Sequence, residues 1–401
     1  MRILIVSCLL PYPTVPHGGG TDLFHLIETL STRHEVHLVS LVLPGDEPHI
    51  AEMRPYVASL HTVIPALTWR QKLHHALREP PWRWGRRARA EVHAAIRRTV
   101  AAGVDVAQFE WTETARFVDA VTDPRVVAVL DEVDVSYRPL ARALGSEDRR
   151  VKAARQRELA WCRRFDVVLT RSEADRAALE PHLPNTRLHV LQPWTHVDAF
   201  RDIGTATREP GTVLFAGAMN RAENADAVLW FYRACWPRVR QAIPTARLVI
   251  AGHAPLPRIT RLAADPTVHR TQRVTVTGTV PDLRPVYARA DVCIAPSLAG
   301  GGVLNKVIDG MAAGRPVVTM AVGNEGVAAP PDAVRVADEP AVFANAVVRL
   351  LRDPDEWARV AAAGRAFVQR TYRWADNVAR LEALYHEMST TKKQRELPQI
   401  K

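Results

Sequence analysis

The sequence predicts an α/β protein with two doubly wound domains, each built on a parallel sheet. Three observations support this prediction. Short apolar runs alternate with segments of helical spacing, a polar stretch interrupts the alternation near the middle, and 401 residues with 47% hydrophobic side chains suffice for two cores. Because ligands of open α/β sheets bind at the carboxyl ends of the strands, we expect the two domains to face a central cleft.

The first domain is expected over residues 1–200. A buried strand is predicted at 2–7 (RILIVS), a helix at 21–32 and a second strand at 35–42. The later strand candidates are 104–110, 126–130, 167–170 and 188–191. Strands separated by helices in this way favour a parallel sheet.

A polar linker at 201–211 (RDIGTATREPG) precedes the second domain, which is expected over 212–370. The predicted elements of this domain are strands at 212–216, 247–250, 274–277, 292–295 and 316–319, and a long helix through 224–243. A further helix is expected at 371–388, followed by a frayed tail at 389–401.

Composition limits the classes of partner. The formal net charge of +10 favours anionic partners, namely nucleotide phosphates, anionic lipid surfaces or nucleic acid, and does not choose among them. The four cysteines form no C-x-x-C pair, so we expect reduced cytoplasmic thiols and no zinc site. No apolar run approaches the roughly 18 residues of a membrane span, and the N-terminal segment lacks the features of a signal peptide.

The segment 299–318 (AGGGVLNKVIDGMAAGRPVV) runs from three glycines into a helix that should begin near Leu304. Glycines let backbone N–H groups approach a phosphate, and a helix N-terminus adds partial positive charge. Lys306 would oppose the helix dipole unless an anion lies there, so we assign it to a diphosphate. Asp309 shares its helix face and can accept hydrogen bonds from ribose hydroxyls. The alternative is an exposed lysine and an ordinary first-turn carboxylate.

This segment resembles the donor-binding motif of family 4 glycosyltransferases, in the subgroup with GGG before an N-K-V-(L/I)-(E/D) helix. Many members have two glutamates eight residues apart, and Gly301 and Asp309 stand at those positions here. The resemblance covers nearly the whole chain. It implies a GT-B fold of two Rossmann-like domains, a retaining sugar transfer from an NDP-sugar in envelope or exopolysaccharide biosynthesis, and a helix at 371–388 that crosses back to the first domain.

The resemblance also implies a set of donor-binding residues. Residues 213–224 (VLFAGAMNRAEN) are similar to the first strand and glycine turn of the family's donor domain, and 277–287 to the loop whose backbone contacts the base. The glycines within 10–21 resemble a loop that approaches the donor phosphate and the acceptor. The implied residues are Gly18, Gly19, Gly20, Gly217, Arg221, Asn224, Val280, Gly301, Gly302, Asn305, Lys306 and Asp309. A merely flexible turn and an exposed loop arginine are the alternatives for the glycines and for Arg221.

Carboxylates near strand ends of the first domain are candidates for handling the acceptor hydroxyl. Glu110 lies near the position where many relatives carry a histidine, and Asp131 follows the next strand. With Lys306 they form the candidate catalytic set. Glu110 should face the cleft with a raised pKa suited to accepting a proton, or else cap a helix that starts at Trp111. The resemblance implies no metal and no cofactor, because the NDP-sugar is a substrate.

Residues 69–98 are basic and carry three tryptophans, which suits anionic lipid headgroups. An ordinary solvated helical face with tryptophans in the core is the alternative. We therefore expect a cytoplasmic enzyme, peripheral at the inner membrane face, whose partners are a nucleotide sugar and a glycan or lipid-linked acceptor. One rival is a catalytically degenerate GT-B protein that binds a nucleotide or a partner. A nucleic-acid-binding protein is the other, and no helix-turn-helix, zinc finger or RNP-like motif supports it.

Overall fold

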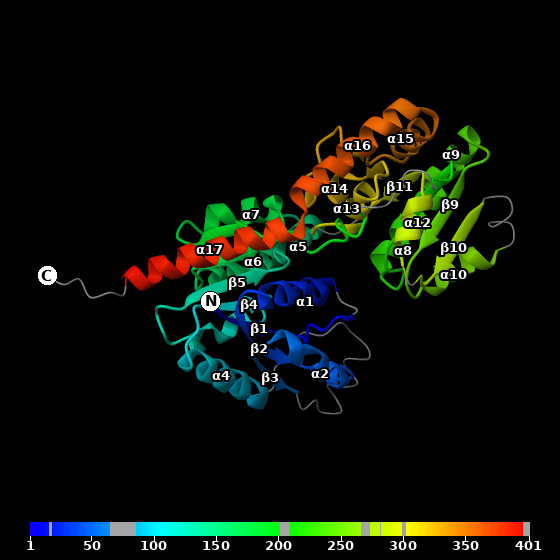
Figure 1. Ribbon diagram of the computed structural model, residues 1–401. Coiled ribbons are helices and arrows are strands. Elements are labelled where there is room, and N and C mark those ends of the chain that lie inside the picture. Colours follow the sequence, from blue (N-terminus) through cyan, green and yellow to red (C-terminus); the bar gives the residue numbers. More distant parts are fainter. Residues whose placement is uncertain are drawn as a thin grey trace. The chain divides into compact units, whose positions relative to one another are not determined.

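The computed structural model describes residues 1–15, 18–64, 86–200, 208–265, 273–280, 282–298 and 302–395. The chain folds as two compact units. Unit 1 comprises Met1–Trp194 and Ala375–Lys401, and unit 2 comprises Thr195–Trp374. Each unit has a parallel sheet flanked by helices, which confirms the prediction of two doubly wound α/β domains (Figure 1).

The sheet of unit 1 has seven parallel strands in the order β3-β2-β1-β4-β5-β6-β7. Its strands are β1 (Arg2–Ser7), β2 (Glu35–Leu41), β3 (Ser59–Val63), β4 (Val106–Glu110), β5 (Val127–Glu132), β6 (Val167–Thr170) and β7 (Arg187–Val190). The sequence did not indicate β3, in which only the last of five residues is buried. The order reverses direction between β1 and β4, where ligands of doubly wound sheets bind.

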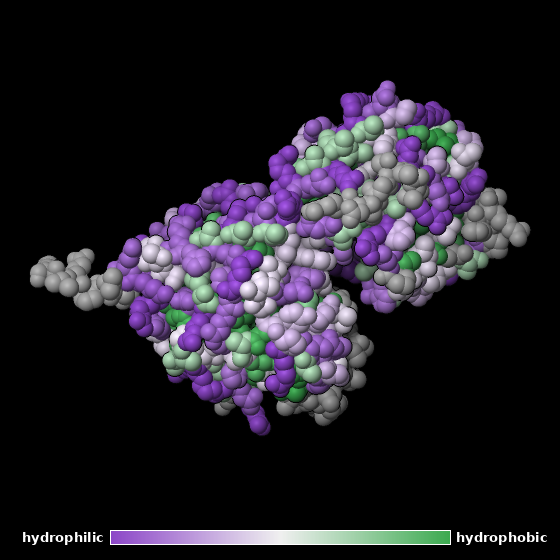
Figure 2. Space-filling model, in the orientation of Figure 1, coloured by the Kyte–Doolittle hydropathy of each residue, from purple (hydrophilic) through white to green (hydrophobic). Residues whose placement is uncertain are grey.

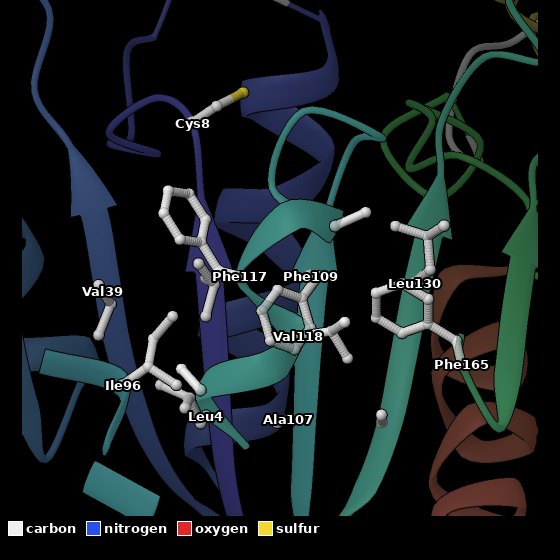
Figure 3. Close-up of a cluster of buried hydrophobic side chains, with 14 of the residues drawn as sticks. Leu4, Cys8, Val39, Ile96, Ala107, Phe109, Phe117, Val118, Leu130 and Phe165 are labelled. Carbon is white, nitrogen blue, oxygen red and sulfur yellow. The ribbon is translucent and has the colours of Figure 1, made fainter. Parts of the chain in front are cut away.

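The helices of unit 1 cover both faces of this sheet. They are α1 (Gly18–Ser31), α2 (Ile50–Met53), α4 (Arg86–Ala101), α5 (Tyr137–Leu144), α6 (Arg149–Cys162), α7 (Glu173–Leu179), α17 (Trp374–Arg395), and the short 3-10 turns η1 (Glu47–His49), η2 (Arg54–Tyr56), η3 (Ala115–Ala120) and η4 (Glu180–His182). Phe109 and Leu130 point into a hydrophobic cluster with α4 and η3 (Figure 3). Because side chains alternate along a strand, Gln108, Glu110 and Asp131 lie on the opposite face.

Helix α17 packs within unit 1, across the sheet (Figure 1). Lys392 Nζ donates to Asp166 Oδ2 at 2.7 Å, and Lys393 Nζ to Asp105 Oδ1 at 2.6 Å. The expectation of a frayed tail from residue 389 is therefore corrected for 389–395, which are helical. Basic side chains in the last turn of a helix interact favourably with the helix dipole. Here they also form ion pairs with carboxylates that precede β4 and β6.

The sheet of unit 2 has six parallel strands in the order β10-β9-β8-β11-β12-β13. They are β8 (Thr212–Ala216), β9 (Arg247–Ala251), β10 (Val274–Gly278), β11 (Val292–Ala295), β12 (Val317–Thr319) and β13 (Arg335–Val336). The helices are α8 (Ala222–Trp230), α9 (Trp236–Ala242), α10 (Pro257–Ala264), α12 (Arg284–Arg289), α13 (Asn305–Ala312), α14 (Ala321–Glu325), α15 (Pro340–Arg352) and α16 (Pro354–Thr371). The helix expected through 224–243 is split by a π-helical turn at Phe231–Cys235. Pro237 follows that turn and has no N–H with which to continue the α-helical pattern.

Hydrophilic residues cover most of the face shown in Figure 2, with hydrophobic residues in small groups among them. Within the described ranges, no helix is both long and apolar enough to cross a membrane. Of the basic segment 69–98, residues 69–85 lie outside the described part of the chain, and the remainder belongs to α4.

Candidate functional site

Lys306 lies in the first turn of α13, beside the glycine turn that follows β8. Its Nζ donates to Asn224 Oδ1 at 2.6 Å and lies 4.9 Å from the centre of the Phe215 ring. A Cβ atom at Gly217 would lie 3.5 Å from Lys306 Cε and 3.2 Å from Asn224 Nδ2. Because β8 and β11 are neighbours, the segments that follow them meet at one edge of the sheet. The structure thus brings together Gly217, Asn224 and Lys306.

The surroundings of Lys306 are suited to an anion. The side chain is partly buried, and this burial, together with the nearby Arg221 charge, lowers its pKa to about 8. In the part of the chain that the structure describes, Nζ has no carboxylate within ion-pair distance. Arg221 itself is exposed at the start of α8 and lies 3.7 Å from Glu223 Oε2. A cation held by an amide and a ring, with a second cation near it, can receive a negatively charged ligand.

The backbone around this cation is tightly packed. A Cβ atom at Gly252 would lie 1.7 Å from the carbonyl oxygen of Gly217, so the turns after β8 and β9 touch through bare backbone. Gly302 precedes α13, and its carbonyl oxygen would lie 2.6 Å from a Cβ atom at Gly326. Asn305 is the exposed first residue of α13. Gly301, which was also assigned to the donor, falls outside the described residues.

Two further predicted donor-binding residues lie in unit 2. Val280 follows β10, at the outer edge of the sheet and two strands away from β8. Asp309 is buried in α13, with 6% of its surface exposed, and its Oδ1 atom accepts no hydrogen bond within the described structure. The same atom lies 3.6 Å from Nδ1 of His196, and this carboxylate is the main cause of the raised pKa of that histidine. No sequence motif indicated His196, which lies beyond the last strand of unit 1.

The three glycines of unit 1 are helical. Gly18, Gly19 and Gly20 form the first turn of α1, where the sequence suggested a loop ahead of the helix. A Cβ atom at Gly20 would lie 3.0 Å from Val15 Cγ2 and 3.2 Å from Leu9 Cδ1. Glycine at this position therefore lets α1 pack against the turn that follows β1, and the first N–H groups of the helix lie at the carboxyl edge of the sheet.

A group of buried charged side chains lies at the same edge of the unit 1 sheet. Glu110 ends β4, and its neighbour in register is Asp131 of β5. Arg171 Nη2 donates to Asp131 Oδ2 at 2.8 Å, and Asp22 of α1 lies close enough to interact with both. Burial raises the pKa of Glu110 and of Asp131, and it raises the pKa of Asp22 to about 7.

Glu110 is hydrogen-bonded by a residue of its own unit. From the sequence, Glu110 was expected to face a cleft. Its side chain is instead completely buried, because helices cover the sheet face that carries it. Gln108 Nε2 donates to Glu110 Oε1 at 2.5 Å, and the Tyr385 hydroxyl of α17 donates to Gln108 Oε1. The alternative of a cap is wrong, since Trp111 has a positive φ of 62° and the next helical turn, η3, begins at Ala115. Asp131 lies within β5 rather than after it.

Comparison with known proteins supports this fold. Residues 210–353 match the family model described as Glycosyl transferases group 1. A curated protein from Klebsiella pneumoniae, described as an uncharacterized 44.6 kDa protein in cps region, is 24% identical over 213 residues, which cover 52% of this chain and 53% of that protein. The match thus spans about half the length of this relative.

Two solved structures resemble the whole chain. The Anabaena protein Alr3699/HepE, in complex with UDP and glucose, has a TM-score of 0.65 at 14% identity, over 96% of this chain and 99% of that one. Sucrose-phosphate synthase from Thermosynechococcus elongatus has a TM-score of 0.66 at 18% identity, over 98% and 100%. The group 1 family model thus matches a part of unit 2, and the chain as a whole shares the two-domain GT-B fold of these solved structures.

Proposed function

We propose that this protein is a retaining glycosyltransferase that moves a sugar from an NDP-sugar to a glycan, lipid-linked or small-molecule acceptor. The observation that carries this proposal is the placement of Lys306. It is a partly buried cation beside Gly217 and Asn224, without a carboxylate partner in the described structure, within the domain that matches the group 1 family. A donor diphosphate would supply the missing negative charge.

In this proposal Lys306 stabilises the charge that develops on the leaving diphosphate. Such stabilisation is strongest where the cation is already positioned and partly shielded from water. Arg221 extends the positive charge, and the N–H groups at the start of α13 donate to phosphate oxygens. The buried Asp309 accepts hydrogen bonds from the ribose, in line with the resemblance to the family 4 subgroup.

A carboxylate of unit 1 takes the proton of the acceptor hydroxyl. Glu110 is the first candidate and Asp131 the second, because burial raises the pKa of each toward the range useful to a general base. Since Glu110 is completely buried, an acceptor reaches it only if the segments above this sheet edge move apart.

The similar proteins support a class of pathway and a class of donor. The curated relative is described as a protein in a cps region, which supports a role in envelope or exopolysaccharide biosynthesis. Alr3699/HepE is also described in complex with UDP-glucose, so UDP-sugars are the first donors to test.

A thermal-shift screen against nucleotide sugars tests this proposal. A donor that binds the native state raises the melting temperature, by an amount that grows with its concentration relative to Kd. We expect one NDP-sugar to raise it and to be turned over when a suitable acceptor is added. Binding without release of NDP under any acceptor would favour the rival, a degenerate GT-B protein. No response to any nucleotide sugar would contradict both.

A further inference from the structure

A buried chain of hydrogen bonds connects the C-terminal helix to Glu110. The Tyr385 hydroxyl of α17 donates to Gln108 Oε1, and Gln108 Nε2 donates to Glu110 Oε1. Tyr385 is 1% exposed, and Gln108 and Glu110 are 0% exposed, so water does not compete with these bonds. All three residues belong to unit 1, although 277 positions separate Tyr385 from Gln108 in the sequence.

The Gln108 amide joins the tyrosine to the carboxylate, with its oxygen toward Tyr385 and its NH₂ group toward Glu110. A carboxamide has one oxygen that accepts and one NH₂ group that donates. Because the Tyr385 hydroxyl donates to Oε1, the NH₂ group is directed at Glu110. This orientation supplies a hydrogen bond to the carboxylate form of Glu110, whose second oxygen, Oε2, has no hydrogen-bond partner in the described structure. That oxygen is the one left to accept a proton.

Other groups around Glu110 act on its charge in opposite directions. Burial is the largest effect and raises its pKa, and the carboxylates of Asp131 on β5 and Asp22 on α1 raise it further. Arg171, which follows β6, lowers the pKa, and the hydrogen bond from Gln108 also lowers it. Cys8, which follows β1, lies close enough for the Glu110 charge to affect it, and burial raises the pKa of its thiol, so it stays neutral. Gln108 therefore favours the ionised form of Glu110, as Arg171 does.

We propose that Tyr385 and Gln108 are positioning residues, which hold Glu110 in the orientation and charge state that the transfer reaction needs. This inference rests on the proposed function. It makes the C-terminal helix part of the reaction machinery, although α17 lies outside the 210–353 segment that matches the family model.

The test compares two buried tyrosines whose hydroxyl groups donate to different acceptors. Tyr385→Phe removes one oxygen atom and releases the amide of Gln108. Tyr137→Phe is the matched control, because Tyr137 is also buried in unit 1 and its hydroxyl donates to a backbone carbonyl, Ala178 O, at 3.0 Å. Gln108→Met keeps a similar volume without the amide and serves as a second variant if Tyr385→Phe folds poorly.

Two quantities are measured for each variant. The pH titration of the Glu110 carboxyl group is followed by ¹³C NMR in the ligand-free protein, with Glu110→Gln used to assign the signal. The pH dependence of kcat is followed with the donor found by the screen. Losing a hydrogen bond to an ionised group raises the pKa of that group, so we expect the Glu110 titration and the acid limb of kcat to move up by about one pH unit in Tyr385→Phe and Gln108→Met. The donor KM should change by less than about twofold, since the donor contacts are elsewhere.

The outcomes separate this inference from the proposed function. It is overturned if the Glu110 titration stays in place in Tyr385→Phe, or if Tyr137→Phe moves it equally. It is also overturned if the titration moves while Glu110→Gln transfers sugar at the wild-type rate, because Glu110 then has no role to be positioned for. A wild-type protein that transfers no sugar contradicts the proposed function instead, and the NMR titration still decides whether the chain of hydrogen bonds sets the charge state of Glu110.

Discussion

Lys306 is the side chain on which the donor site depends most. Its pKa of about 8 means that the free protein holds this charge below pH 8 and loses it as pH rises through that value. We therefore expect donor affinity to fall above about pH 8. Lys306→Ala should abolish transfer with a native circular-dichroism spectrum, and Lys306→Arg should restore it only in part, because a planar guanidinium fits a different geometry.

The matched control for this substitution is Lys152→Ala. Lys152 is a half-exposed lysine of α6 whose Nζ lies 2.7 Å from Glu147 Oε2, and removing it should leave transfer unchanged. Donor binding measured by calorimetry between pH 6 and 9.5 checks both statements. Equal donor affinity in Lys306→Ala and wild type would remove Lys306 from the site.

Substitutions of Asp309 distinguish a donor-binding role of this residue from a catalytic role. Its carboxylate is buried with one oxygen unpaired by hydrogen bonds in the described structure, and the proposed ribose contact exists both before and during the reaction. Asp309→Asn should therefore raise the donor KM more than it lowers kcat, whereas Asp309→Glu should be tolerated. Steady-state kinetics with varied donor decides this, and a loss confined to kcat would assign Asp309 to the chemical step.

The turns that follow the strands of unit 2 position the donor-binding side chains. Among the glycines that the structure describes in these turns, Gly252 leaves the least space for a side chain. A methyl group there would lie 1.7 Å from Gly217 O, so the turns after β8 and β9 would have to separate. We expect Gly252→Ala to lower the free energy of unfolding by about 3 kcal/mol and to weaken donor binding. Gly278→Ala is the control. Gly278 has a φ of +68° and open space around it, so the same change should cost only about 1 kcal/mol. Urea denaturation of both variants measures this difference, and equal losses would contradict the collision.

Local patterns predicted most elements, because a buried strand or an amphipathic helix is visible in its own residues. The apolar runs at 2–7 and 292–295 coincide with β1 and β11. The same patterns cannot show which distant segment covers a sheet face. The partners of Glu110 and Asp309 thus escaped prediction, since Tyr385 and His196 reach them through tertiary packing. The end of α17 was missed for a related reason, because Lys392 and Lys393 are stabilised by carboxylates more than 200 positions away.

In the molecule as a whole, the positive charge remains to be explained by a partner. The net charge is +10, and residues 69–98 carry part of it beside three tryptophans. We expect the protein to bind vesicles that contain anionic lipids, with binding that weakens as salt rises from about 0.05 to 0.5 M, because salt screens the attraction. Flotation with anionic and neutral vesicles checks this. Equal retention on both kinds would exclude an electrostatic attachment.

The proposed function requires that this protein transfers a sugar with retention of the anomeric configuration. The most direct measurement follows the anomeric signals of donor and product by ¹H NMR during one reaction, with the donor from the screen and an added acceptor, in wild type and in Lys306→Ala. We expect release of NDP in step with a product that keeps the anomeric configuration of the donor, and no turnover in the variant. A product of inverted configuration, or a bound donor that is never consumed, would contradict it.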